Sequence, residues 1–224
     1  MQDTRILGAG MTEETPVTPA VAEPQPLRLH RQYALSGLIA TGAFLLEQLA
    51  THATALRGAT AWHRVGGALE RTDLVVFFEL VFVLAPLAFH LVAGGKLARP
   101  RAERFTDALL AVFVLVHFWE LPVQRAFVGL TADGTYTRMV ADYSRTWGGI
   151  PLLALVAITG IGLASFVLAR SLLALGRPRV LATTLGAVLF VVGAASIVGI
   201  ATGSAFVPAQ SFTDTACGAA VETH

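Results

Sequence analysis

The sequence predicts an all-α integral membrane protein, a bundle of five transmembrane helices. Of its 224 residues, 54% are apolar and 14% are charged, whereas soluble proteins average about a quarter charged residues. The mean hydropathy is +0.65. A helix needs roughly 20 mostly apolar residues to cross a bilayer. Five stretches reach that length, at 33–55, 74–95, 105–127, 149–174 and 180–204.

The polar segments that flank these stretches are short, so residues 31–205 are predicted to form one membrane domain. Residues 1–30 include a run rich in Thr, Pro, Val and Glu with no apolar period, which predicts a tail that is disordered or ordered by a partner. Residues 206–224 form a C-terminal tail. The single cysteine, Cys217, excludes a disulfide within the chain and a metal site built from its thiols.

The first two stretches carry polar residues on an apolar background. The first holds Glu47, Gln48 and His52, and the second holds Glu79 and His90. Glu79 and His90 are 11 residues apart, close to three helical turns, and therefore share one face. A polar side chain at bilayer depth costs about a few kcal/mol unless it faces the bundle interior and is paired. Each of these residues is therefore a candidate functional residue.

The later stretches add four more candidates of the same kind. The third holds His117, Trp119 and Glu120, and the fourth holds Arg170. Glycines on the first, fourth and fifth stretches favour close helix packing.

Depth in the membrane separates the histidines. Counted at 1.5 Å per residue from the cytoplasmic ends, His117 lies about 18 Å deep, Gln48 about 21 Å and His90 about 6 Å. Histidine is the usual protein ligand of haem iron. Because two axial ligands need the same depth, His90 and His117 are not expected to share a haem. His52 is one turn beyond Gln48, about 9 Å from the level of His117.

The outer half of the bundle is predicted to contain a polar layer. Its members are Gln48, His52, Glu79, His117, Trp119 and Glu120. Such a layer could donate hydrogen bonds to the carbonyls of a quinone and supply protons. The alternative is that these side chains only bond neighbouring helices, with the tryptophan as an aromatic anchor at the interface.

Positive charge suggests an orientation. With alternating helices, one side of the membrane holds eight Lys and Arg residues and the other holds six. The eight are Arg28, Arg31, Lys96, Arg99, Arg101, Arg104, Arg177 and Arg179. The positive-inside rule then predicts a cytoplasmic N-terminus and an external C-terminus. The net charge of +1 gives no indication of nucleic-acid binding.

Several strings resemble one family of membrane subunits. Residues 44–51, FLLEQLAT, are similar to the first helix of the cytochrome b anchor of succinate dehydrogenase and fumarate reductase, in its five-helix, two-haem branch. Residues 86–90, PLAFH, and residues 117–120, HFWE, resemble the second and third helices of that family. The resemblance covers residues 31 to about 127, and the remainder matches by helix number and length.

The resemblance implies a bacterial-type inner-membrane anchor for a flavoprotein and an iron–sulfur subunit on the cytoplasmic face. Electrons would pass between that iron–sulfur protein and menaquinone or ubiquinone. The chain itself would not be the dehydrogenase. His90 and His117 stand at two positions of the family's haem ligands, with Gln48 at a third and His52 as its substitute. Glu47, Glu79, Glu120 and Trp119 would lie near a quinone or proton path.

Two departures reduce the expected haem content. Gln48 replaces one family ligand, and no histidine or methionine occurs between Met139 and His224. At most one haem b is therefore expected, and loss of both is the other outcome. No metal other than haem iron is expected. The alternatives to a quinone-reactive anchor are a small proton-coupled transporter or channel subunit and a membrane scaffold without chemistry.

Overall fold

The protein is described by a computed structural model over residues 25–58, 60–62, 72–119, 139–147 and 149–202. Its helices are α1 (Gln25–Leu56), α3 (Thr72–Phe78), the π-helix η1 (Glu79–Leu84), α4 (Ala85–Gly95), α5 (Arg101–Phe118), α8 (Leu152–Ala174) and α9 (Arg179–Ala201). In these residues the only β-type pairing is an isolated bridge between Trp147 and Ile150. The predicted all-α fold is confirmed.

Four helical segments are long and apolar enough to cross a membrane. They are Leu27–Leu56, Val76–Gly95, Leu152–Ala174 and Arg179–Ala201. The described part of α5 differs because it carries four charged side chains near its start, at Arg101, Glu103, Arg104 and Asp107. Residues 120–127 of the predicted third span lie outside the described residues. The chain is thus an all-α membrane bundle with four candidate spans, and a fifth span stays a prediction.

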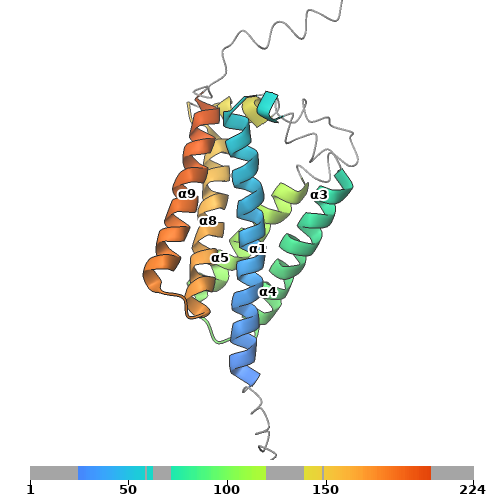
Figure 1. The fold of residues 1–224 in the computed structure, drawn as a ribbon, viewed down its shortest axis with the longest axis vertical. Coiled ribbons are helices and arrows are strands. Elements are labelled where there is room, and N and C mark those ends of the chain that lie inside the picture. Colours follow the sequence, from blue (N-terminus) through green and yellow to red (C-terminus); the bar gives the residue numbers. More distant parts are fainter. Residues whose placement is uncertain (1–24, 59, 63–71, 120–138, 148, 203–224) are drawn as a thin grey trace, which may run out of the picture.

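The helices form one bundle in which α1 is central (Figure 1). It packs against α8, α9, α4 and η1, and α8 also packs against α9 and α5. The start of α1, the 96–100 connection and the 175–178 connection lie together at the lower end in Figure 1. We call this the basic end, since the eight Lys and Arg residues predicted to share one side lie in these segments or in the first turns of α5 and α9, which follow them. Helix α1 begins at Gln25, so six residues of the predicted N-terminal tail are helical.

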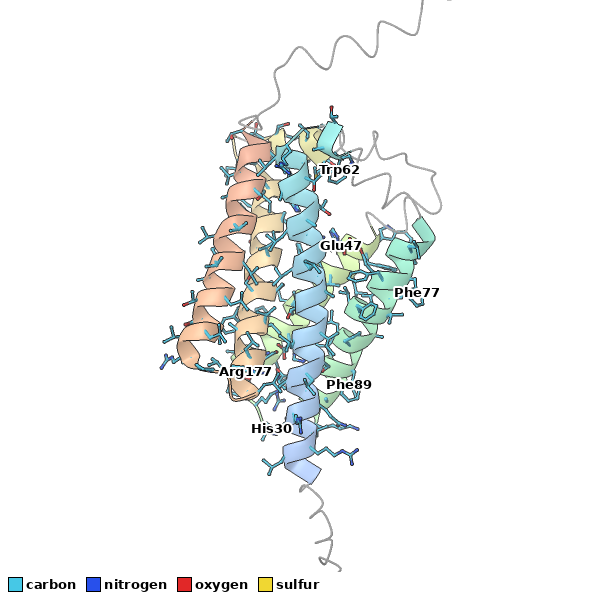
Figure 2. All side chains as sticks on the ribbon, viewed as in Figure 1. His30, Glu47, Trp62, Phe77, Phe89 and Arg177 are labelled. Carbon is cyan, nitrogen blue, oxygen red and sulfur yellow. The ribbon has the colours of Figure 1, made fainter. Side chains whose placement is uncertain are left out.

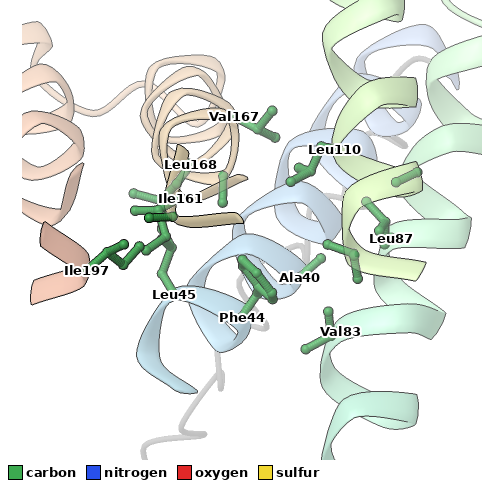
Figure 3. Packing of buried hydrophobic residues seen from close by; sticks show 14 residues of the cluster. Ala40, Phe44, Leu45, Val83, Leu87, Leu110, Ile161, Val167, Leu168 and Ile197 are labelled. Atoms are coloured by element: carbon green, nitrogen blue, oxygen red, sulfur yellow. The ribbon is translucent and has the colours of Figure 1, made fainter. Parts of the chain in front are cut away.

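The core runs along α1 and contains side chains from every major helix (Figure 3). Phe44 and Leu45 of α1 are buried with Leu110 of α5, Ile161 of α8 and Ile197 of α9. Large apolar side chains also cover the outside of the bundle. They include Val92, Phe105 and Val180, with 60%, 69% and 77% exposure. So extensive an apolar exterior suits lipid rather than water.

The π-helix follows from a proline. Pro86 has no N–H, and its ring would clash with the carbonyl four residues earlier in a regular α-helix. In η1 the turn is wider, and the Ala85 N–H bonds to the carbonyl of Leu80, five residues back. Such π-turns are frequent at functional sites. The first residue of η1 is Glu79, whose side chain is buried.

Candidate functional site

Two buried polar clusters lie along the bundle. The Asp107 cluster, near the basic end, consists of Tyr33, His90, Arg99, Asp107 and Arg170. The Glu79 cluster, in the other half, consists of Glu47, Gln48, Glu79 and His117. On α5, Asp107 and His117 are 10 residues apart, and along η1 and α4, Glu79 and His90 are 11 residues apart. The two clusters are therefore separated by about 15–16 Å along the bundle.

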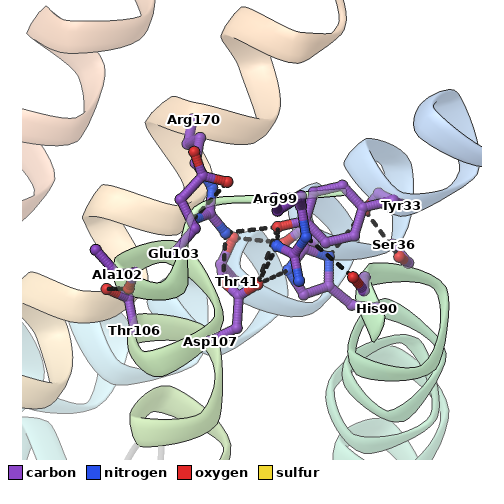
Figure 4. Close-up of polar contacts among 12 residues, drawn as sticks. Tyr33, Ser36, Thr41, His90, Arg99, Ala102, Glu103, Thr106, Asp107 and Arg170 are labelled. Atoms are coloured by element: carbon purple, nitrogen blue, oxygen red, sulfur yellow. Dashed lines mark hydrogen bonds and ion pairs between the residues drawn. The ribbon is translucent and has the colours of Figure 1, made fainter. Parts of the chain in front are cut away.

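The carboxylate of Asp107 is the centre of the first cluster (Figure 4). Its Oδ2 accepts hydrogen bonds from the Tyr33 hydroxyl at 2.9 Å and from Arg99 Nη1 at 2.6 Å. Its Oδ1 accepts one from Arg170 Nη2. The Arg99 guanidinium also lies over the Tyr33 ring, 4.3 Å from its centroid. Because the Asp107 side chain is only 1% exposed, this is a buried ion network.

His90 is held against the same network. Its Nδ1–H donates to the backbone carbonyl of Tyr33 at 2.8 Å, and its ring stacks on the Tyr33 ring with centroids 4.0 Å apart. Its Nε2 lies 3.5 Å from Asp107 Oδ2. A Cβ at Gly37 would lie 2.6 Å from both His90 Cε1 and Ser171 Oγ. Glycine at this position therefore allows α1, α4 and α8 to meet at the cluster.

Several donors beside Asp107 lack a hydrogen-bond acceptor among the described residues. They are Arg170 Nε and Nη1 and the hydroxyl of Ser171. Ser171 is 2% exposed, and the nearest carboxylate to Arg170 Nη1 outside the cluster is Glu103 Oε2 at 3.7 Å. A buried donor without an acceptor costs about 1–3 kcal/mol. This arrangement suits a ligand that presents acceptor oxygens.

A small apolar pocket adjoins the Asp107 cluster and is too narrow to hold a water molecule. Its wall includes Leu87 and Leu110, each three residues from a cluster member on the same helix. The remaining lining residues are Ala40, Thr41, Phe44, Val83 and Val114. The pocket therefore begins about one turn from His90 and Asp107, on the side toward the Glu79 cluster.

The Glu79 cluster joins three helices. Glu47 comes from α1, Glu79 from η1 and His117 from α5, and one potential metal-ligand atom of each lies within 4.8 Å of the others. Gln48 Nε2 bonds His117 Nε2 at 2.7 Å. Figure 2 shows Glu47 in the upper half of α1, far from the basic end marked by His30. Glu79 is 2% exposed, and Glu47 and His117 are half-buried.

The other residues predicted for the polar layer are placed differently. His52 is buried, and its Nδ1–H donates to the Gln48 carbonyl at 2.6 Å while its Nε2 accepts from the Tyr143 hydroxyl at 2.9 Å. Trp119 is 64% exposed and faces outward, as an aromatic anchor would. Glu120 lies outside the described residues. Of the predicted layer, Gln48, Glu79 and His117 thus lie together, joined by Glu47, with His52 one turn away.

The ring nitrogens of His52 and His90 and Nε2 of His117 face protein groups in this arrangement. Both ring nitrogens of His90 face protein groups, and Asp107 occupies the position in front of Nε2. Both ring nitrogens of His52 are hydrogen-bonded, and Nε2 of His117 meets Gln48. Haem b ligation by His90, His117, His52 or Gln48 stays a prediction.

Sequence reasoning missed three members of the Asp107 cluster, namely Tyr33, Arg99 and Asp107. Asp107 could have been predicted from the sequence, because it is a carboxylate within the predicted span 105–127, and ionisable residues in the other spans were taken as candidates. Tyr33 and Arg99 lie at the ends of predicted spans, where polar residues are ordinary. Their part in the cluster follows only from packing between segments far apart in sequence.

Comparison of the chain with protein-family models, with curated proteins and with solved structures gave no match. The likeness to the succinate dehydrogenase and fumarate reductase anchors therefore rests on the strings in residues 31–127.

Proposed function

We propose that the chain is the membrane anchor and quinone-reactive subunit of a succinate:quinone or quinol:fumarate oxidoreductase. The strings in residues 44–51, 86–90 and 117–120 suggest this class of complex. The single observation that carries the quinone site is the Asp107 cluster with the neighbouring Ser171, because buried donors of Arg170 and Ser171 have no acceptor among the described residues.

The chemistry of a quinone matches this cluster. A quinone head group presents two carbonyl oxygens, which are acceptors without donors, and an apolar isoprenoid tail. The Arg170 guanidinium and the Ser171 hydroxyl would bond one carbonyl, and the adjacent apolar pocket would receive the start of the tail. Because the pocket is too narrow for a water molecule and ordinary ligand sites enclose roughly 300–1,000 Å³, binding of the tail requires the lining side chains to move apart.

Reduction of a quinone to a quinol takes two electrons and two protons. The electrons would come from the iron–sulfur subunit bound at the basic end. Arg99 and Arg170 would stabilise the negative charge that develops on the quinone oxygen as electrons arrive. Both protons would come from water at the basic end, passed one after the other through the Tyr33 hydroxyl and the Asp107 carboxylate to which it is hydrogen-bonded.

The basic end would also be the docking surface for the iron–sulfur subunit, on the cytoplasmic side. Arg101, Arg104 and Arg179 are exposed there. With the electron donor at this end, a quinone at the Asp107 cluster is about 15 Å closer to it than one at the Glu79 cluster. That difference favours the Asp107 cluster as the reaction site when no haem is invoked.

The test is purification of the tagged chain from its native membrane, followed by assay of succinate-dependent quinone reduction. We expect flavoprotein and iron–sulfur subunits to co-purify. Ser171→Ala should raise the KM for quinone about 10-fold, since one lost hydrogen bond of about 1.4 kcal/mol corresponds to that factor. Ser165→Ala is the matched control, because Ser165 is also buried on α8 without a hydrogen-bond partner among the described residues.

Two results would contradict the proposal. One is purification of the chain without a flavoprotein subunit. The other is an equal KM for the Ser171→Ala and Ser165→Ala complexes, which would remove the Asp107 cluster as the quinone site.

A further inference from the structure

The Glu79 cluster has no part in the quinone site proposed above, yet its side chains are a coherent set of ligands. Two carboxylates and one imidazole converge from α1, η1 and α5, with their ligand atoms within 4.8 Å of one another. Carboxylate oxygens and imidazole nitrogens together are the donors that zinc and neighbouring divalent metals take in proteins. The imidazole distinguishes this set from a simple group of acids.

The charges of the cluster suit a divalent cation. Glu79 is 98% buried, and Glu47 is half-buried in a bundle whose exterior is apolar. Two carboxylates side by side in such surroundings repel each other when both are ionised. One divalent ion bound by both would relieve this repulsion.

The geometry is close to that of a bound state. At metal–ligand distances of about 2.1 Å, neighbouring ligands of a tetrahedral ion are about 3.4 Å apart. The observed limit of 4.8 Å therefore requires an approach of about 1.4 Å or less. Rotation of the half-buried Glu47 side chain can supply much of this. Along the helices, Glu79 is three residues, about 5 Å, from the end of the span Val76–Gly95, and Glu47 is nine residues, about 14 Å, from the end of the span Leu27–Leu56.

Gln48 supplies the outer contact that metal-binding histidines ordinarily have. Its side-chain amide lies 2.7 Å from His117 Nε2. With a metal on Nδ1 of His117, Nε2 carries the proton, and the amide turned by 180° presents its oxygen as the acceptor. Such a contact fixes the ring and is commonly worth 10–100-fold in metal affinity.

The π-helix is a second feature of this arrangement. Glu79 is the first residue of η1, and π-turns are frequent at functional sites. Its carboxylate lies close to Glu47 of α1 and His117 of α5.

We propose that Glu47, Glu79 and His117 bind one divalent transition-metal ion of the zinc type, with Gln48 as a positioning residue for His117. The site is independent of the quinone proposal, because the two clusters share no residue. Either can fail while the other stands.

The test uses the full chain, purified in detergent with an affinity tag that contains no histidine. The protein is stripped with a chelator, titrated with Co²⁺ as a spectroscopic probe, and analysed for bound Zn²⁺ by elemental mass spectrometry. We expect one ion per chain and visible d–d bands from Co²⁺ with nitrogen and oxygen ligands. Glu79→Gln should weaken binding at least 100-fold, and Gln48→Leu should weaken it 10–100-fold.

Glu103→Gln is the matched control, because it removes a carboxylate on α5 that lies at the basic end. It should bind metal like the unmodified chain. Glu47→Gln provides the same test at a half-buried position if Glu79→Gln does not fold, as judged by gel filtration. Less than 0.2 ion per chain in the unmodified protein, or equal affinity in the Glu47, Glu79 and Glu103 variants, would overturn the proposal.

Discussion

Removing the charge of Asp107 should destabilise the protein more than any other single isosteric change at the basic end. In Asp107→Asn the side chain keeps its shape, but two guanidinium groups lose their common counterion. Arg99 and Arg170 are 8% and 16% exposed, so water screens them poorly. Leaving a buried charge unpaired typically costs about 3–5 kcal/mol.

The hydrogen bonds from the two guanidinium groups to Asp107 give a consistent figure. At about 1.5–3 kcal/mol each, they sum to about 3–6 kcal/mol when both are lost. The asparagine oxygen still accepts one bond, so the expected cost is at the lower end, about 3–4 kcal/mol. The free energy of unfolding can be measured by SDS titration of the purified protein in mixed micelles, followed by helical circular dichroism.

A matched substitution and a double-mutant cycle make this prediction specific. Glu103→Gln removes a carboxylate that is 33% exposed and 3.7 Å from Arg170, and it should cost less than about 1 kcal/mol. Asp107→Asn combined with Arg170→Met should be more stable than Asp107→Asn alone, because one uncompensated charge is gone. A cost below about 1 kcal/mol for Asp107→Asn, or strict additivity in the cycle, would show that Asp107 does not act as the counterion of the two guanidinium groups.

Three further predictions concern packing and topology. Gly37→Ala should lower the free energy of unfolding by about 1–3 kcal/mol, because its Cβ would lie 2.6 Å from two side chains. Gly95→Ala, which would have nothing within 4 Å of its Cβ, should be neutral or slightly stabilising in the same SDS titration. Equal costs for the two substitutions would contradict this packing. Tyr143→Phe should cost about 0.5–1.5 kcal/mol through loss of its bond to His52 Nε2, and an unchanged SDS midpoint would count against that bond. The third prediction uses Arg177→Cys in a chain whose Cys217 is replaced by serine, because position 177 is exposed at the basic end. The new cysteine should react with a membrane-impermeant maleimide only in inverted vesicles. Labelling in intact cells would reverse the proposed orientation.

Run length and hydropathy were sufficient to locate most of the bundle. The predicted stretches 74–95, 149–174 and 180–204 agree within three residues with the candidate spans Val76–Gly95, Leu152–Ala174 and Arg179–Ala201. The bilayer thickness sets this length, so composition alone determines it. Helix α5 is the exception, because its first turns carry four charged side chains, of which Asp107 belongs to the Asp107 cluster.

The Glu79 cluster could be foreseen in part, and the Asp107 cluster could not. Counting turns put Gln48 and His117 at nearly the same depth, and they are in contact in the structure. The Asp107 cluster joins residues as far apart as Tyr33 and Arg170, and their meeting depends on which helix faces match. Hydropathy carries no information about helix rotation. The π-turn likewise became evident only in the structure, although Pro86 was its local signal.

Photolabelling is the most direct test of the proposed quinone site at the Asp107 cluster. The purified complex is illuminated with an azido-quinone, and the labelled peptides are mapped by mass spectrometry. We predict labels within one turn of Tyr33, His90 or Ser171, and competition by unmodified quinone. Labels confined to the Glu79 half of the bundle, or labelling that excess quinone does not suppress, would contradict the claim.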